Sequence, residues 1–303
     1  MRYVVTGAAG FIGSHLAESL VALGHEAHGI DCFTDYYDPA LKEENARGLD
    51  VHRLDLAEDT LDFDGFDGVF HLAGQPGVRS FGDVFPLYLR RNLLASQRVF
   101  EAAARDGVKV VFASSSSIYG AAERYPTPED TRPHPLSPYG ITKLACEHLA
   151  DAHTREFGLD CVVLRYFNAF GPRQRPDMAF TRIVFALAES RPFDLYGDGE
   201  QSRGWTYVRD IVDGTILAMA GGSGTYNVGG ALEASMNETI AVLERISGRT
   251  LEQRRHPSVP GDQRRTQADT TRIRGELGWE PRVSLEHGLT RQWEWASARV
   301  AAG

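Results

Sequence analysis

The sequence predicts an α/β protein with a doubly wound parallel sheet and a smaller C-terminal domain. Two observations lead to this fold class. Short apolar segments alternate with segments of helical period through the first half of the chain, which is typical of a parallel sheet covered by helices on both faces. A glycine-rich turn also stands directly between the first expected strand and the first expected helix, as in many doubly wound folds.

The expected elements follow one another in the order that a parallel sheet requires. Apolar runs predict strands over residues 3–5, 27–30, 51–54, 69–72, 108–113 and 161–164. Apolar residues at helical spacing predict helices over residues 12–23, 93–104 and 139–157. Right-handed crossovers between these strands give the doubly wound arrangement.

The second half of the chain is less regular. Prolines and glycines cluster between Gly171 and Gly204, and a helix over 211–219 and a strand over 225–228 indicate late returns to the sheet. We therefore expect one domain from residues 1–167 plus about 205–230. A second domain is expected from residues 168–204 plus 231–303.

Composition excludes several classes of protein. Of 303 residues, 42% are hydrophobic and 24% charged, with a net charge of −9, which is ordinary for a globular protein and excludes a disordered chain, a collagen or a membrane bundle. The negative charge gives no broad attraction to nucleic acid or anionic lipid. Three cysteines without metal-like spacing predict free thiols, no metal site and a cytoplasmic location. The residues before the first expected strand do not have the pattern of a signal peptide, so none is expected.

The basic residues are unevenly divided. Lys42, Lys109 and Lys143 are the only lysines among 32 basic residues. The excess of arginine is explained by a GC-rich genome, which encodes arginine wherever the surface needs positive charge. A lysine that is retained in such a sequence indicates chemistry that arginine does not perform. Lys42, in a charged stretch, and Lys109, at a strand entrance, are expected at the surface.

Gly7, Gly10 and Gly13 form the glycine turn. Glycines there let the chain turn sharply and let a pyrophosphate approach the backbone at the start of a helix, so the motif predicts a dinucleotide site in a Rossmann fold. Asp31 ends the second strand, where a carboxylate accepts from an adenosine ribose and repels a 2′-phosphate; this favours NAD over NADP. Asp55 is expected at the adenine edge. A turn or capping role remains the alternative for each aspartate.

Tyr139 and Lys143 form a Y-x-x-x-K pair. On a helix this spacing puts both side chains on one face. A tyrosine with a pKa of about 10 is a poor base at neutral pH, but a nearby ammonium stabilises its phenolate. The serine run 114–117 ends a strand at the carboxyl edge of the sheet, where open α/β folds bind ligands. Together these features predict proton transfer beside the dinucleotide.

The chain resembles the extended short-chain dehydrogenases/reductases, in the NAD-dependent epimerase/dehydratase group that acts on nucleotide sugars. The stretches that carry the resemblance span residues 6–269 and are TGAAGFIGSHL, HLAGQPGVR, SSSSIYG, SPYGITK, LRYFNAFGPRQ, LYGDGEQSRGWTYVRD and PGDQRRTQAD. One mild departure is Gly74, where the family often has alanine.

The resemblance implies a role for each matching residue. Tyr139 is the implied general base, Lys143 its electrostatic partner and Ser115 a residue that shares the proton. The residues implied to line NAD are Gly7, Gly10, Phe11, Ile12, Gly13, Asp31, Asp55, Leu56, Leu72, Ala73, Gly74, Tyr139 and Lys143. Asn168 and Arg203 are expected at the diphosphate, Arg182 more weakly so, and Asp262 at the nucleotide ribose.

Among the reactions of this group, the sequence favours 4-epimerisation. Relatives that dehydrate or decarboxylate have an acidic residue two positions before the tyrosine of the serine segment, where this chain has Ser117, and a hydroxyl does not replace a carboxylic acid in those eliminations. A transient 4-keto sugar would accept its hydride back on the other face, with NAD retained. A non-enzymatic NAD-binding protein is a further alternative.

The segment over residues 171–179 resembles that of UDP-glucuronate 4-epimerases. Arg175 is then expected to clamp the hexuronate carboxylate with two parallel hydrogen bonds, with Ser116 as a further donor. Asn168 also fits epimerases of UDP-glucose and UDP-N-acetylglucosamine, which are the alternative. The family further implies a homodimer paired through helices 93–104 and 144–157, although the core could use the same apolar faces.

Overall fold

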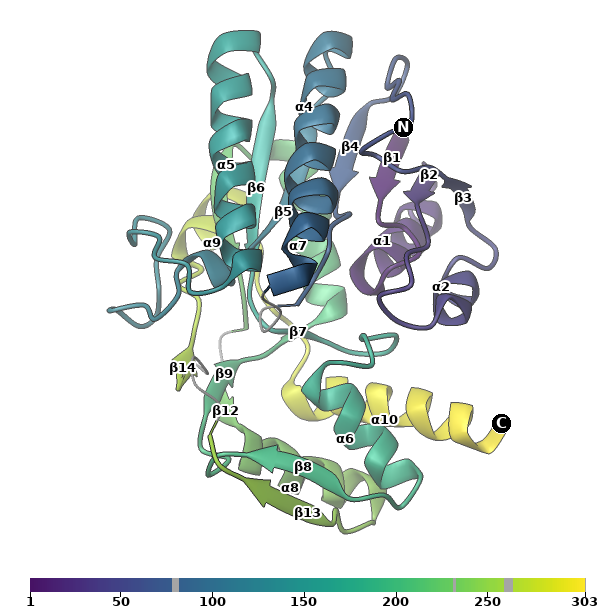
Figure 1. Ribbon diagram of the computed structural model, residues 1–303, viewed down its shortest axis with the longest axis vertical. Coiled ribbons are helices and arrows are strands. Elements are labelled where there is room, and N and C mark those ends of the chain that lie inside the picture. The colour runs from purple at the N-terminus through teal and green to yellow at the C-terminus, as the bar shows by residue number, and fades with distance from the viewer. Residues whose placement is uncertain (78–81, 231–232, 259–263, 303) are drawn as a thin grey trace.

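The computed structural model describes residues 1–77, 82–230, 233–258 and 264–302. Its central sheet has seven parallel strands in the order β11-β6-β5-β4-β1-β2-β3 (Figure 1). The strands are β1 (Arg2–Thr6), β2 (Glu26–Asp31), β3 (Asp50–Arg53), β4 (Gly68–His71), β5 (Val110–Ser115), β6 (Cys161–Tyr166) and β11 (Gly224–Val228). This confirms the predicted doubly wound fold. The strand order reverses between β1 and β4, and ligands bind at such a switch point.

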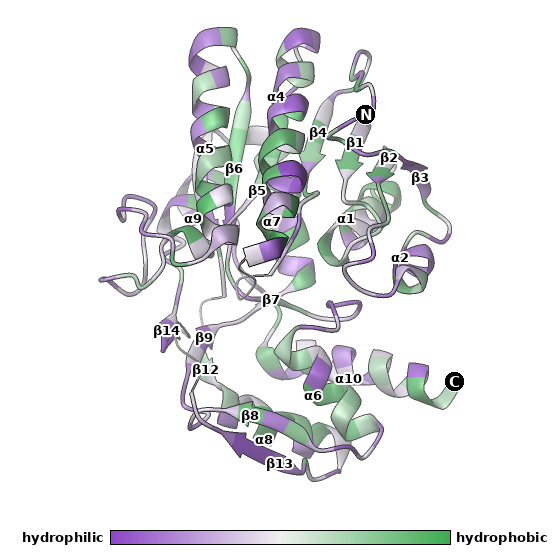
Figure 2. Ribbon diagram, viewed as in Figure 1, coloured by the Kyte–Doolittle hydropathy of each residue, from purple (hydrophilic) through white to green (hydrophobic). Residues whose placement is uncertain are grey.

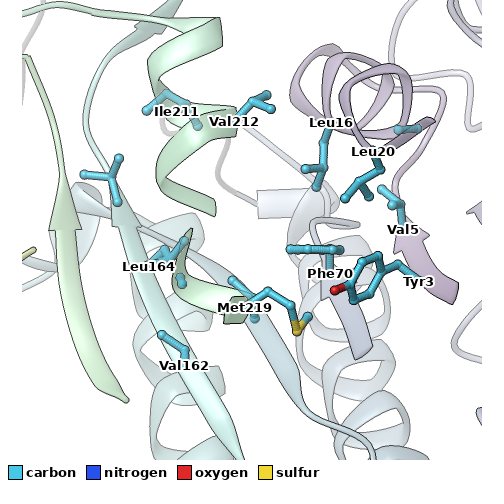
Figure 3. Close-up of a cluster of buried hydrophobic side chains, with 14 of the residues drawn as sticks. Tyr3, Val5, Leu16, Leu20, Phe70, Val162, Leu164, Ile211, Val212 and Met219 are labelled. Atoms are coloured by element: carbon cyan, nitrogen blue, oxygen red, sulfur yellow. The ribbon is translucent and has the colours of Figure 1, made fainter. Parts of the chain in front are cut away.

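Helices cover both faces of the sheet, and the strands alternate between them. Val5 and Phe70 pack with Leu16 of α1 (Phe11–Ala22) and Ile211 of α7 (Val208–Gly221) on one face (Figure 3). Their strand neighbours Val4 and Val69 belong to the opposite core, under α4 (Ala95–Asp106) and α5 (Pro138–Phe157). Because successive residues point to opposite faces, strands buried on both sides are apolar throughout.

Two helix starts set up the cleft described below. Ser137 accepts a hydrogen bond from the Gly140 N–H (3.1 Å) and Pro138 follows as the first residue of α5, a favourable N-terminal pattern. By contrast, Gly10 precedes α1 without any side-chain cap, and no acidic residue lies in its first turn. The first N–H groups of α1 are therefore left for a ligand.

The later part of the chain forms small sheets and helices below the main sheet (Figure 1). Strands β8 (Phe193–Tyr196) and β13 (Gln253–His256) pair with each other, as do β7 (Ala169–Phe170) and β10 (Thr206–Tyr207). Strands β9 (Ser202–Gly204), β12 (Glu233–Ser235) and β14 (Arg265–Thr266) make a third sheet. The apolar faces of α6 (Ala179–Ala188), α8 (Met236–Ser247) and α10 (Leu285–Ala302) meet in a separate core (Figure 2).

We propose that the chain divides into two domains close to the expected boundaries. Helix α9 (Thr271–Leu277) lies against β11 and α7, and Ile273 and Trp279 share the core of the main sheet. This part of the C-terminal region is therefore best grouped with the first domain.

The remaining short elements connect these layers. They are α2 (Pro39–Asn45), a 3-10 turn over Gly82–Val84, α3 (Phe85–Tyr88), a π-helical segment over Leu89–Leu94 that leads into α4, and a 3-10 turn over Ser116–Ile118. No helix in the described ranges is long and apolar enough to cross a membrane.

Candidate active site

A cleft opens at the carboxyl ends of β1, β2, β4 and β5, and it gathers all thirteen of the predicted dinucleotide residues. It is lined by Gly7, Gly10, Phe11, Ile12, Gly13, Asp31, Asp55, Leu56, Leu72, Ala73, Gly74, Tyr139 and Lys143. Arg175 lines the same cleft. The residues come from elements far apart in the sequence, so the fold brings together what the motifs could only suggest separately.

The glycine turn has the shape that a pyrophosphate needs. Gly7 has a φ of +71°, and a Cβ there would lie 2.9 Å from the Ala73 nitrogen. A Cβ on Gly13 would lie only 2.1 Å from the Gly7 carbonyl oxygen. The turn thus holds the start of α1 close to β1 with no side chain in the way. This bare cradle, together with the uncapped helix start, fits a dinucleotide.

Asp31 is fixed by the backbone around it. Its two oxygens accept from the Ala9 N–H at 3.1 Å and the Phe33 N–H at 2.8 Å. A carboxylate has about four acceptor positions, so both oxygens can also accept from a ribose. The turn role and the ribose role are therefore compatible, and the ribose contact stays a prediction.

Asp55 has stronger partners within the chain. It accepts from the Ala57 N–H (2.9 Å) and from Arg90 (2.6 Å). Burial opposes the effect, but these hydrogen bonds lower the pKa of Asp55. It stays ionised at the edge of the cleft beside Leu56, and its adenine contact remains a prediction.

Tyr139 and Lys143 lie one turn apart near the start of α5, and both line the cleft. Lys143 is 4% exposed. Its Nζ donates to the Ala113 carbonyl at 2.8 Å and lies 4.8 Å from the centre of the Phe112 ring. One donor of the ammonium is thus committed to β5, which leaves others for the cleft. Tyr139 is half-buried, at the same wall.

The serines of the run 114–117 make different hydrogen bonds, and only some of them face the cleft. Ser114 lines the cleft and donates to Glu147 at 2.5 Å. Ser115 accepts from the Ser117 N–H and donates to the Ser117 hydroxyl (3.1 Å), and Ser116 begins the following turn. Neither Ser115 nor Ser116 is among the described residues that line the cleft. Their contacts with substrate stay predictions.

His71 supports the wall of the cleft from inside the core. The Thr6 hydroxyl accepts from the N–H groups of Leu72 and Ala73, both at 3.1 Å. Its own proton therefore points to His71 Nδ1, at 2.8 Å. His71 then carries its proton on Nε2 and donates to Ser96 at 3.0 Å. Burial, and then repulsion from Lys143, lower the pKa of His71 to about 3.

This histidine should make the fold sensitive to acid. Its pKa is about 3 in the folded protein and about 6.5 in an unfolded chain. Between these values only the unfolded chain takes up the proton, so stability falls as the pH drops from 6.5 toward 3, by about 1.4 kcal/mol for each pH unit. Urea unfolding of the wild type and His71→Gln at pH 7, 6, 5 and 4 measures this. The variant should be less stable than the wild type at pH 7 but should lose less of its unfolding free energy as the pH falls. If the unfolding free energies of both proteins fell in parallel, His71 would not be the source of the acid sensitivity.

Lys42 is not a surface residue, contrary to the expectation from its charged stretch. It is 6% exposed, lines the cleft and donates to the Thr34 hydroxyl at 2.8 Å. Burial lowers its pKa, against the attraction of Asp31. The face of α2 that carries Lys42 also carries Asn45, which donates to the Ala9 carbonyl in the glycine turn at 3.1 Å. A long aliphatic stem lets a lysine lie in such a wall, so charge in the sequence did not reveal its place.

Arg175 lies in a loop that we call the clamp loop, residues 171–178. Its Nε and Nη2 donate to the two oxygens of Asp177, at 2.9 and 3.0 Å. Although burial opposes it, Asp177 raises the pKa of Arg175. Tyr36, from the loop after β2, donates to Asp177 at 3.2 Å. In this structure a carboxylate of the chain, that of Asp177, fills the guanidinium fork, and the contact of Arg175 with a hexuronate stays a prediction.

The clamp loop is attached to α1. Arg173 donates to Glu18 and to His15 Nδ1 (3.0 Å), and the Pro172 carbonyl is 3.0 Å from His15 Nε2. These contacts tie the loop that carries Arg175 to the helix that begins at the glycine turn. The loop position is thus coupled to the dinucleotide half of the cleft.

The predicted diphosphate residues lie outside this cleft. Asn168 donates to the Thr266 hydroxyl at 2.8 Å, and Thr266 pairs with Arg203 across β14 and β9. Arg182 lies instead on α6, with its guanidinium 5.5 Å from the centre of the Phe193 ring. The structure therefore places Asn168 and Arg203 near each other and Arg182 elsewhere. Asp262 lies outside the described residues.

Several residues of the cleft were not among the predicted site residues. They are Ile30, Cys32, Thr34, Tyr36, Tyr37, Lys42, Leu54, Gln75, Pro76, Arg91, Ala95, Ala113, Ser114 and Tyr166. Most lie at the carboxyl end of a strand of the main sheet or in the segment that follows it. The rule that ligands bind at the carboxyl edge could have drawn attention to the segment 32–37.

Comparison with known proteins gives one consistent family. The model of the NAD dependent epimerase/dehydratase family matches residues 3–229. The chain is 40% identical to YtcB, an uncharacterized UDP-glucose epimerase of Bacillus subtilis, over 98% of each chain. It is 34% identical to the UDP-glucuronate 4-epimerase of Thermodesulfobacterium geofontis, over 98% of this chain and 97% of that one.

A solved structure agrees with the sequence relatives. The UDP-glucuronic acid 4-epimerase of Bacillus cereus, in complex with UDP-glucuronic acid and NAD, matches with a TM-score of 0.95 and 37% identity, over 99% of this chain and 100% of that one. The resemblance inferred from the motifs is confirmed: the chain belongs to the NAD dependent epimerase/dehydratase family.

Proposed function

We propose that the chain is a UDP-sugar 4-epimerase that interconverts UDP-glucuronate and UDP-galacturonate. The observation that carries the substrate assignment is Arg175, a guanidinium fork in the same cleft as Tyr139 and Lys143. Its two parallel hydrogen bonds to Asp177 have the geometry with which it would hold a hexuronate carboxylate. Similarity to UDP-glucuronate 4-epimerases supports the same assignment.

The glycine turn and Asp31 would hold NAD, with the pyrophosphate at the start of α1. Bound NAD would take a hydride from C4 of the sugar and return it. Tyr139 takes the proton of the 4-hydroxyl and later gives it back, helped by the Lys143 ammonium, which favours the phenolate. Ser115 would share this proton. The 4-keto sugar must rotate between the two steps, so that it receives the hydride on its other face.

Among the described residues that line the cleft, no acid for elimination lies beside Tyr139. Among its described lining residues the carboxylates are Asp31 and Asp55. Asp31 ends β2 and Asp55 follows β3, whereas Tyr139 lies by β5, with β1 and β4 between them. Dehydration and decarboxylation are therefore less well supported than epimerisation.

A neutral sugar is the second candidate. Asn168 fits epimerases of UDP-glucose or UDP-N-acetylglucosamine, and the 40% identical relative is named a UDP-glucose epimerase. The purified protein should therefore be incubated separately with UDP-glucuronate, UDP-glucose and UDP-N-acetylglucosamine, with C4 stereochemistry followed by NMR. We expect UDP-glucuronate to be converted fastest. Faster conversion of UDP-glucose would transfer the assignment to the neutral sugar, and no product from any of the three would favour a non-enzymatic role.

We further propose a homodimer. Large apolar side chains are exposed on and beside the two helices that the family resemblance implicates: Leu94 (46%), Ile141 (50%) and Phe157 (68%). A second copy would cover this surface. The cysteines Cys32, Cys146 and Cys161 are unpaired, which is consistent with the predicted cytoplasmic location.

A further inference from the structure

The fork of Arg175 is filled by the same chemical group as the one it is proposed to recognise. Asp177 accepts from Nε and Nη2 of Arg175 with both of its oxygens, at 2.9 and 3.0 Å. Tyr36 donates to one of these oxygens, at 3.2 Å. A hexuronate carboxylate that takes this place must displace Asp177.

Displacement needs little rearrangement of the chain. The Asp177 side chain is 41% exposed, whereas that of Arg175 is 23% exposed. Rotation of Asp177 would return its charge to water, while the clamp loop keeps its attachment to α1 through Arg173. The Arg175 guanidinium would exchange one carboxylate for another, and the number of its charged hydrogen bonds would stay the same.

A neutral sugar has a different effect on this pair. The hydroxymethyl group of a hexose carries no charge and does not replace a carboxylate in a bidentate pair. Arg175 would remain bound to Asp177, and the cleft would stay neutral at this point. Without Asp177, a neutral sugar would leave a half-buried guanidinium unpaired, which is unfavourable.

We propose that Asp177 determines specificity by standing in for the substrate carboxylate. It competes with hexuronates for Arg175 and compensates the charge of Arg175 when the sugar is neutral. This inference rests on the proposed function, because it takes Arg175 as the carboxylate-binding residue. In energetic terms, the fork is competent for a hexuronate only in the fraction of molecules from which Asp177 has moved away, and apparent affinity falls in that proportion.

Substitution Asp177→Asn tests the proposal. The KM and dissociation constant for UDP-glucuronate should fall by up to about fivefold, which corresponds to the strength of an exposed or half-exposed ion pair. The kcat should change little. For UDP-glucose the KM should stay the same or rise, so that the ratio of kcat/KM values shifts toward the uronate. Titration calorimetry with both nucleotide sugars gives the dissociation constants without requiring turnover.

Two further variants separate this role from a general effect. Asp213→Asn removes an aspartate of similar exposure (44%) that is paired with Arg209 on α7, away from the cleft, and should leave both constants unchanged. Asp177→Glu keeps a carboxylate and should behave more like the wild type than Asp177→Asn does. Thermal unfolding checks that each variant is folded.

The outcomes are distinguishable. If UDP-glucuronate binds Asp177→Asn more weakly, or both sugars change equally, the proposal is overturned and Asp177 only supports the position of Arg175. If the wild type converts no UDP-sugar at all, the proposed function itself fails. The calorimetric constants then still decide whether Asp177 competes with a carboxylate ligand.

Discussion

Replacing Tyr139 with phenylalanine should reduce turnover of UDP-glucuronate by about 10²–10⁴-fold, the usual contribution of a general acid–base residue. The substitution removes one hydroxyl and leaves a ring of the same shape in the cleft wall. Without the phenol, no side chain takes the proton from the 4-hydroxyl as the hydride leaves. Because Lys143 keeps its bond to Ala113 and the glycine turn is unchanged, the variant should still bind NAD.

NMR at C4 measures the loss of turnover, and the NAD content of the purified variant shows whether the cofactor site survives. Tyr226→Phe is the matched control, because it removes a buried hydroxyl that donates to Glu276 outside the cleft. It should affect stability more than turnover. Retained epimerase activity in Tyr139→Phe would remove Tyr139 from its proposed role.

The middle of the central sheet could be predicted from the sequence because β1, β4, β5 and β6 are buried on both faces, whereas the edge strand β3 is largely exposed. Val4 and Val5 enter opposite cores, so the runs are apolar throughout and easy to find. The glycine turn was equally visible, since Gly7 and Gly13 leave no room for a Cβ. Both features depend on a few adjacent residues, so a short stretch of sequence is enough to predict them.

Contacts between distant segments could not be found in this way. Lys42 looked like part of a solvated charged run, yet its place is decided by Thr34 and by the packing of α2 on the glycine turn. In the same way, Asp177 lies two residues after Arg175, but only the folded loop brings its carboxylate to the fork. The strands of the small sheets, β7 to β10 and β12 to β14, are two to four residues long, too short to show a period.

The scarcity of lysine pointed to Lys143, but a second of the three lysines also proved to belong to the cleft. Two of the three lysines, Lys42 and Lys143, line the cleft. In both, a compact ammonium donates to a neutral oxygen at 2.8 Å, Thr34 Oγ1 for one and the Ala113 carbonyl for the other. A planar guanidinium presents its donors in a fixed fork and would fit neither place. At Arg175, by contrast, the planar fork is used, because its Nε and Nη2 donate to both oxygens of one carboxylate.

Replacing Arg175 with alanine should separate the two candidate substrates. Charged hydrogen bonds contribute about 1.5–3 kcal/mol, so kcat/KM for UDP-glucuronate should fall about 10–100-fold. For UDP-glucose, whose sugar carries no carboxylate, the change should stay within about threefold, because Arg175 binds only Asp177 while that sugar is present. Arg175→Lys keeps the positive charge but not the planar fork. Its kcat/KM for UDP-glucuronate should lie between those of the wild type and Arg175→Ala.

The informative quantity is the ratio of the losses in kcat/KM for UDP-glucuronate and UDP-glucose, rather than either loss alone. Arg245→Ala removes an exposed arginine on α8 that pairs with Glu286 at 2.9 Å and does not line the cleft, and should leave both substrates unaffected. The NMR spectra should also be searched for a pentose product, because a carboxylate next to the 4-keto group that is no longer held in one plane is freer to leave as carbon dioxide. Equal losses for the two sugars would mean that Arg175 only orders the clamp loop. A loss confined to the uronate, with the neutral sugar intact, would assign the carboxylate to Arg175 and make the pairing with Asp177 the state that the substrate must replace.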